Sequence, residues 1–163
     1  MIQPTTKHIC TYNLFVLPYS RSFLREVRMA LTPQRFQKLL LKACAKETSF
    51  DPDGWTPENP LWGHCAVVSL LANDYFGGIF VRAFLDETPF SSVGSHYWNI
   101  LADGTEIDFT RDQFGDTDLR LVGKPTKSDG KLIDRDYLLK NAETKKRYDL
   151  LWVTFESLKD QTS

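Results

Sequence analysis

The chain has 163 residues, 42% of them hydrophobic and 25% charged, and its formal net charge is −1. These values are typical of one globular domain with one core, and they exclude a largely disordered chain. Because there is no basic excess, and no apolar run approaches the roughly 20 residues of a membrane-spanning helix, we expect neither a nucleic-acid partner nor a membrane.

The N-terminal part of the sequence divides into an unpatterned stretch and a helix. Residues 1 to 28 show neither helical nor alternating periodicity, so we predict a poorly packed tail or an over-long start, ahead of a single domain over residues 29 to 163. A helix is predicted from Thr32 to near Thr48, because a Thr cap and Pro33 precede apolar residues at i, i+3, i+4 and i+7.

The middle of the chain predicts a buried helix followed by strands. After the turn-rich segment DPDGWTPENP, residues 65–76 are apolar on most sides and should form a central helix. We expect Gly77 or Gly78 to end this helix by adopting a positive φ. Residues 79–85 are predicted as a strand, and the segment SHYWNILADGTEIDFT as a β-hairpin.

The C-terminal part returns to helical spacing after Asp134, although the segment LLWVTF could instead form a strand. The predicted fold class is therefore α+β, with N-terminal helices packed on a small antiparallel sheet and a C-terminal helix.

Cys65 stands where the central helix should begin. The positive end of a helix dipole and a nearby imidazolium both stabilise a thiolate, so this position suits a nucleophile. The alternative is a structural cysteine, since cysteine is among the most buried residue types and CAVVSLLA has the composition of a core helix.

The hairpin supplies a histidine and a carboxylate that could complete a catalytic triad with Cys65. A two-residue turn would place Asn99 opposite Asp108 and put Asp108 on the other sheet face from His96. A three-residue loop with Gly104 in the left-handed region would put both side chains on one face. Gly104 suits either turn, so the local sequence leaves both open. If the two-residue turn forms, Asn99 or a backbone carbonyl would have to orient His96.

A metal site is the rival interpretation of these residues. Four side chains could together ligate zinc or another transition metal: His64, Cys65, His96 and Asp108. Adjacent residues rarely converge on one ion, and no C-x-x-C, H-E-x-x-H, phosphate-loop or dinucleotide pattern is present, so we expect neither a metal nor a cofactor. The cysteines, Cys10, Cys44 and Cys65, have no disulfide-like spacing, which indicates a reducing compartment and a cytoplasmic protein.

Three stretches resemble the YunG-like family of small, uncharacterised bacterial proteins: WTPENPLWGHCAVVSLLANDYFGG, SHYWNILADGTEIDFTRDQF and ETKKRYDLLW. The resemblance covers roughly residues 29 to 153. The family's triplet usually reads Gly-Gln-Cys where this chain has Gly63-His64-Cys65. If that glutamine helps to polarise a carbonyl, His64 must replace it or the activity is changed.

The order Cys, His, Asp also resembles the papain-like and transglutaminase-like cysteine enzymes. This resemblance implies a helix bearing the cysteine against an antiparallel sheet, with Cys65 as nucleophile, His96 as general base and Asp108 as its orienter. It further implies oxyanion donors at the Cys65 amide and His64, and acyl transfer from an amide, thioester or glutamine side chain.

The remaining candidates for substrate binding are Trp62, Trp98 and Asn99, of which the two tryptophans could frame a cleft. The expected function is a cysteine-dependent hydrolase or acyltransferase that acts on a small molecule, peptide or protein. The alternative is a non-catalytic binding or regulatory domain in which His96 and Asp108 form a buried structural pair.

Overall fold

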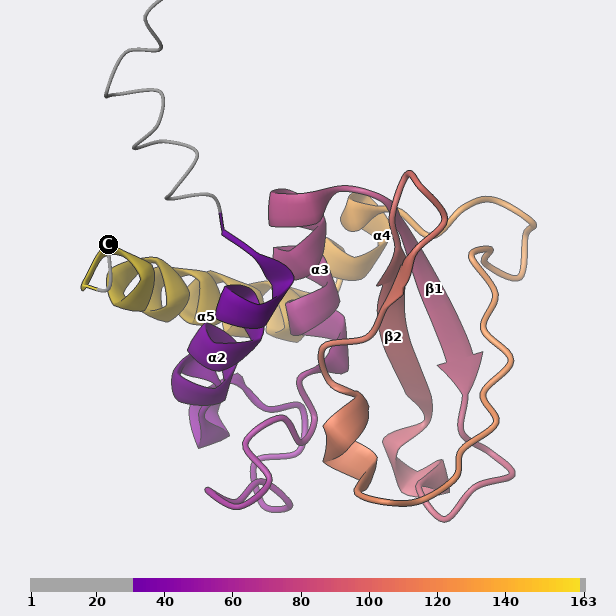
Figure 1. Ribbon diagram of the computed structural model, residues 1–163. Coiled ribbons are helices and arrows are strands. Elements are labelled where there is room, and N and C mark those ends of the chain that lie inside the picture. The colour runs from indigo at the N-terminus through magenta and orange to yellow at the C-terminus, as the bar shows by residue number, and fades with distance from the viewer. Residues whose placement is uncertain (1–30, 162–163) are drawn as a thin grey trace, which may run out of the picture. The chain divides into compact units, whose positions relative to one another are not determined.

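The computed structural model describes residues 31–161, so the prediction of a tail over residues 1 to 28 lies outside the described part of the chain. The described residues form an α+β fold in which a small sheet lies on one side and the long helices on the other (Figure 1).

Within residues 31–161, the helical side contains four α-helices. They are α2 (Pro33–Ala43), α3 (Cys65–Phe76), α4 (Arg135–Leu139) and α5 (Ala142–Gln161). Helix α3 contacts both α5 and strand β2, so it occupies the centre of the fold (Figure 1). None of the helices in residues 31–161 combines the length and the apolar character needed to cross a bilayer.

The sheet has three antiparallel strands in the order β1-β2-β3. The strands are β1 (Ile79–Phe84), β2 (Ser95–Ile100) and β3 (Glu106–Ile107), and short 3₁₀ helices occur at η1 (Lys46–Thr48), η2 (Ser91–Val93) and η3 (Arg111–Phe114). After η3 the chain returns along the free edge of β1, where Arg82 pairs with Lys124 (Figure 1).

The β2–β3 hairpin has the three-residue loop. Asn99 pairs with Ile107, the Leu101 N–H donates to the Thr105 carbonyl over 2.8 Å, and Gly104 has a φ of +85°. This register continues to Trp98 opposite Asp108, so the carboxylate shares a sheet face with His96.

The main core is built around Phe36 of α2. Its ring lies 4.6 to 5.8 Å from four aromatic rings that come from α3, from α5 and from the segment after β3. Those rings are Tyr75, Phe76, Phe109 and Phe155. Burial of this face accounts for the helical periodicity of the sequence, because α2, α3 and α5 each direct an apolar stripe to one cluster.

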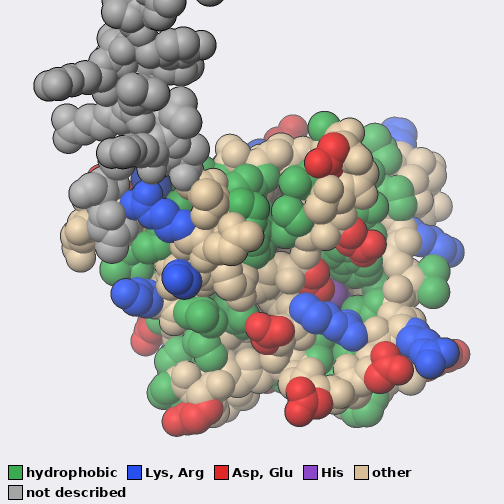
Figure 2. All heavy atoms as spheres, in the orientation of Figure 1, with side chains coloured by type: hydrophobic (Ala, Val, Ile, Leu, Met, Phe, Trp, Pro, Cys, Tyr) green, Lys and Arg blue, Asp and Glu red, His purple; other side chains and the backbone are tan. Residues whose placement is uncertain are grey.

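The opposite face of the sheet is covered by the segment that follows η3. Trp98 packs there with Val81 and Leu121. A Cβ at Gly123 would lie 2.3 Å from the Trp98 ring, so only glycine allows the backbone to approach this closely. The surface of the face drawn in Figure 2 intersperses acidic and basic side chains.

One predicted element differs from that observed. Helix α2 ends at Ala43 rather than near Thr48, because Cys44 is extended and the Thr48 hydroxyl accepts the Ala45 N–H in a separate 3₁₀ turn. The segment 150–155, for which a strand was the alternative prediction, is helical within α5, as the helical spacing predicts. The prediction for the end of α3 is confirmed, since Gly77 and Gly78 have φ values of 71° and 88°.

Candidate active site

Cys65 is the first residue of α3. The preceding Gly63 has a φ of 74°, a conformation that side chains disfavour, and His64 is the N-cap with no side-chain hydrogen bond to the helix. The first amides of a helix have no acceptor within it, so the sulfur lies beside uncapped N–H groups and the positive end of the dipole.

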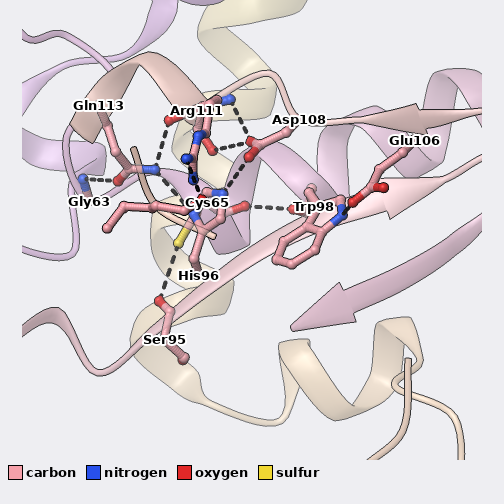
Figure 3. Close-up of polar contacts among 12 residues, drawn as sticks. Gly63, Cys65, Ser95, His96, Trp98, Glu106, Asp108, Arg111 and Gln113 are labelled. Carbon is pink, nitrogen blue, oxygen red and sulfur yellow. Dashed lines mark hydrogen bonds and ion pairs between the residues drawn. The ribbon is translucent and has the colours of Figure 1, made fainter. Parts of the chain in front are cut away.

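His96 stands on β2 in a fully buried position beside the thiol (Figure 3). Its Nε2 lies 2.6 Å from Oδ2 of Asp108. Its ring stacks on Trp98 at 5.5 Å between centroids and meets the edge of Phe114 at 5.0 Å. The imidazole is therefore fixed in orientation by one charge-assisted hydrogen bond and two aromatic neighbours.

The second oxygen of Asp108 is also engaged. Oδ1 accepts the Thr110 N–H at 3.1 Å and the Thr110 hydroxyl at 3.2 Å. These bonds turn the chain out of β3 into η3, which explains why β3 has only two residues. Because Thr110 holds one oxygen, the other is directed at His96.

The neighbours of His96 shift its pKa in both directions. Burial by itself lowers the pKa of His96, but hydrogen bonds to Asp108 and Cys65, together with the charges of these two groups, outweigh it and raise the pKa to about 9. The Cys65 sulfur also lies 3.8 Å from the Ser95 carbonyl oxygen, to which the thiol can donate. The structure thus brings the three predicted residues together as a thiol, an imidazole and a carboxylate.

Gln113 of η3 is a site residue that the sequence analysis missed. Its Nε2 lies 3.3 Å from Nδ1 of His96 and 2.8 Å from the Thr110 carbonyl, and its Oε1 accepts the Gly63 N–H at 3.3 Å. The side chain therefore links the loop before Cys65 to the imidazole (Figure 3). The only sequence signal was its place inside the stretch SHYWNILADGTEIDFTRDQF.

His64 has a structural position rather than the expected one facing an oxyanion. Its Nδ1 lies 2.9 Å from the Trp62 carbonyl, which can only accept, so this nitrogen carries the proton. Its Nε2 lies 2.8 Å from the Thr48 hydroxyl. Burial lowers the pKa of His64 to about 4, so the ring is neutral and no ring N–H remains for a substrate.

The other candidate residues lie around the triad in different roles. Trp62 donates to Asp51 over 2.9 Å and packs near Phe90, whereas Trp98 is the ring that stacks on His96 and donates to Glu106. Asn99 faces α3 and donates to the Ser69 carbonyl at 3.2 Å, so it ties the strand to the helix and does not orient His96.

A small cavity of about 140 Å³ opens beside the sulfur. Its lining includes Cys65, Ser95, Tyr97, Phe50 and Arg147. Among residues 31–161, no cluster of three or more His, Cys, Asp or Glu side chains has the arrangement of a metal site.

The family model of the YunG protein matches residues 32–159, which is most of the chain. The chain belongs to the YunG family. One relative is "Uncharacterized protein YunG" of Bacillus subtilis (strain 168), with 37% identity over 60 residues. These residues are 37% of this chain and 46% of the relative, so the match spans about half of the relative's length. No solved structure matches the chain.

The family match includes every residue of the site described above. Cys65, His96, Asp108, Gln113 and Arg147 all lie between residues 32 and 159. The family assignment gives no chemistry by itself, so a function must be argued from the geometry of these side chains.

Proposed function

We propose that this protein is a cysteine-dependent hydrolase or acyltransferase, with Cys65 as nucleophile, His96 as general base and acid, and Asp108 as the group that orients His96. The observation that carries the proposal is the 2.6 Å contact from Asp108 to an imidazole that lies beside a thiol at a helix N-terminus. This combination activates a thiol and is uncommon around a merely structural cysteine.

The proposed reaction is acyl transfer in two steps. The Cys65 sulfur attacks the carbonyl carbon of an amide or thioester and forms a C–S bond, while the thiol proton resides on His96. The bond from the carbonyl carbon to the leaving amine or thiol then breaks, and the imidazolium donates its proton to that group. Water, or an acceptor amine, next attacks the acyl-enzyme, passes a proton to His96 and releases Cys65.

The negative charge that develops on the carbonyl oxygen needs donors that are already in place. The Cys65 amide and the following uncapped amides of α3 supply them, together with the helix dipole. Because both ring nitrogens of His64 are engaged, the proposal assigns this role to backbone groups and not to His64.

The arrangement of elements supports a likeness to papain-like and transglutaminase-like enzymes. A helix that begins with the cysteine packs on an antiparallel sheet, and the histidine and aspartate come from successive strands or their ends. A free thiol of this kind functions in a reducing compartment, which agrees with a cytoplasmic location.

Selective alkylation tests the proposal. At neutral pH and limiting iodoacetamide, Cys65 should react at least about tenfold faster than Cys44, because burial raises the pKa of the Cys44 thiol whereas the Cys65 thiol has His96 beside it. Peptide mapping by mass spectrometry would locate the label, and a Cys65→Ser variant is the control. An unreactive Cys65 in the folded protein would contradict an enzymatic role.

One observation favours the alternative of a non-catalytic binding domain. Both nitrogens of His96 have protein partners, Asp108 and Gln113, and the ring is fully buried. In that case the cluster would hold η3 against β2, and His96→Gln would lower stability while the labelling of Cys65 stayed unchanged. An enzyme requires the opposite result, because removal of the base slows the thiol.

A further inference from the structure

Arg147 of α5 has a guanidinium group that the protein only partly satisfies. Its Nη2 donates to the Thr144 hydroxyl at 3.2 Å, and the group lies over the Phe50 ring at 5.6 Å. Its Nη1 is buried and has no hydrogen-bond partner among the described residues. A buried charged donor without an acceptor is costly, so such a group calls for a partner such as an ordered water, an ion or a ligand.

No carboxylate of the described residues lies within 4.0 Å of this guanidinium. Burial is the largest influence on Arg147 and lowers its pKa, whereas the charges of Cys65 and, more weakly, of Glu143 one turn earlier on α5 raise it. The half-buried Arg135, by contrast, is paired with Asp74. Arg147 is therefore a cation near the thiol that has one donor, Nη1, without an acceptor among the described residues.

This cation lies in the wall of the cavity beside Cys65. Phe50, Thr144 and Arg147 line that cavity and also line a wider hollow of about 630 Å³ that extends toward Asn141 and Leu150. A ligand that extends from the thiol into the hollow must therefore pass the guanidinium. Both cavities lie on the same side of α5, and the fork of donors on an arginine fits a carboxylate in two-point contact.

We propose that Arg147 binds a carboxylate of the substrate, so that the acyl donor is an anion whose carboxylate lies close to the scissile carbonyl. This inference rests on the proposed function of Cys65 and adds the class of substrate to it. Nη1 has no exposed surface in the unliganded protein, so binding requires the guanidinium to turn this donor toward the cavity, while Nη2 stays near the Thr144 hydroxyl and the group stays over the Phe50 ring.

A pair of alkylating reagents tests the proposal without knowledge of the substrate. Iodoacetate and iodoacetamide have nearly the same size and react by the same step, in which the Cys65 sulfur displaces iodide from carbon. Only iodoacetate carries a carboxylate. A change in the reactivity of the thiol itself affects both rate constants equally and cancels in their ratio. The ratio at Cys65 thus reports on an anion site next to the sulfur.

We expect Arg147→Gln to lower the iodoacetate-to-iodoacetamide ratio by about tenfold, the size of one charge-assisted hydrogen bond. Arg147→Lys, which keeps the charge, should retain most of the preference. The control is Lys145→Gln, since Lys145 is on the same helix but points to solvent, where it pairs with Asp149. That variant should leave the ratio unchanged.

The outcomes separate this inference from the proposed function. If Cys65 resists both reagents in the folded wild-type protein, the nucleophile itself is refuted. If Cys65 reacts readily and Arg147→Gln changes both rate constants by the same factor, the cysteine chemistry stands, Arg147 acts on the thiolate alone, and the carboxylate site is refuted. Circular dichroism of each variant confirms that the comparison is between folded proteins.

Discussion

Two buried histidines, thirty-two positions apart in one small domain, have their pKa values shifted in opposite directions by their neighbours. His64 contacts a neutral hydroxyl and a carbonyl and lies near the charge of Arg147, so burial dominates and lowers its pKa to about 4. His96 is just as buried, but Asp108 and Cys65 raise its pKa to about 9. The two residues share their type and their burial, so the difference between their pKa values comes from their hydrogen-bonding and charged partners.

Asp108→Asn should disable His96 through its tautomer. The two Thr110 donors require an acceptor at Oδ1, so the new amide nitrogen must face Nε2 of His96 and force that nitrogen to accept. The proton then resides on Nδ1, which can no longer take a proton from Cys65. We expect alkylation of Cys65 to slow on the order of tenfold or more.

The imidazole ¹⁵N shifts of His96 would report the tautomer directly, and its pKa should fall in the Asp108→Asn variant. Asp112→Asn is the matched control, because Asp112 is an exposed acid four residues later in the same segment. An unchanged tautomer and an unchanged rate in Asp108→Asn would show that Asp108 does not orient the base.

At this scale the sequence predicts residues whose type and spacing are distinctive. A Cys before an apolar helix and a His and Asp on one hairpin form such a pattern, and the structure places these three side chains together. Gln113 and Arg147 belong to no distinctive sequence pattern, because a glutamine in a short 3₁₀ turn and an arginine in a charged helix usually have ordinary surface roles. Their importance depends on contacts with residues 17 to 82 positions away.

Among the elements, α3 decides where the site is, because it carries the cysteine and packs between α5 and β2. Its end is as constrained as its start. A Cβ at Gly78 would lie 2.3 Å from the Ile100 carbonyl oxygen of β2, whereas a Cβ at Gly77 would meet nothing within 4 Å. Both residues have positive φ, and they differ in the space around them.

Gly77→Ala and Gly78→Ala therefore form a matched pair. We expect Gly77→Ala to lower the free energy of unfolding by about 1 to 3 kcal/mol, because a φ of 71° with a ψ of −150° is a backbone conformation essentially restricted to glycine. Gly78→Ala should cost about 1 to 3 kcal/mol more, because the backbone of β2 must shift. Urea denaturation would measure both, and equal losses would show that the contact between the α3 terminus and β2 relaxes freely.

The elements themselves were largely predictable, since α3, β1 and β2 follow from apolar runs bounded by glycine. The shortness of α2 and β3 was not. Both end where a side chain competes for the backbone, Thr48 in one case and Asp108 in the other, and such competition depends on tertiary position.

At the scale of the whole molecule, His96 and His64 make stability depend on pH in opposite directions. The folded pKa of His96, about 9, exceeds the usual 6.5, so its contribution is complete below about 6.5 and is lost as the pH rises to 9. The folded pKa of His64 is about 4, so its contribution is complete above 6.5 and is lost as the pH falls to 4.

We therefore expect the free energy of unfolding to be greatest near pH 6.5, with a change of at most about 3 kcal/mol from each histidine. His96→Gln should flatten the limb between pH 6.5 and 9, and His64→Gln should reduce the slope between pH 6.5 and 4. Each variant is the control for the other. A His96→Gln protein that keeps the full alkaline loss would show that another group causes it.

The loop of the β2–β3 hairpin has a consequence for how such a chain can vary. Surface loops ordinarily accept insertions and deletions with little cost. Residues 102–104 are exposed, yet their number determines from which side of the sheet Asp108 emerges. The residue types of this loop can be substituted as long as position 104 keeps the backbone conformation of Gly104. The number of its residues cannot fall by one, because the carboxylate would then turn away from His96 and Phe109 would turn away from Phe36 in the core.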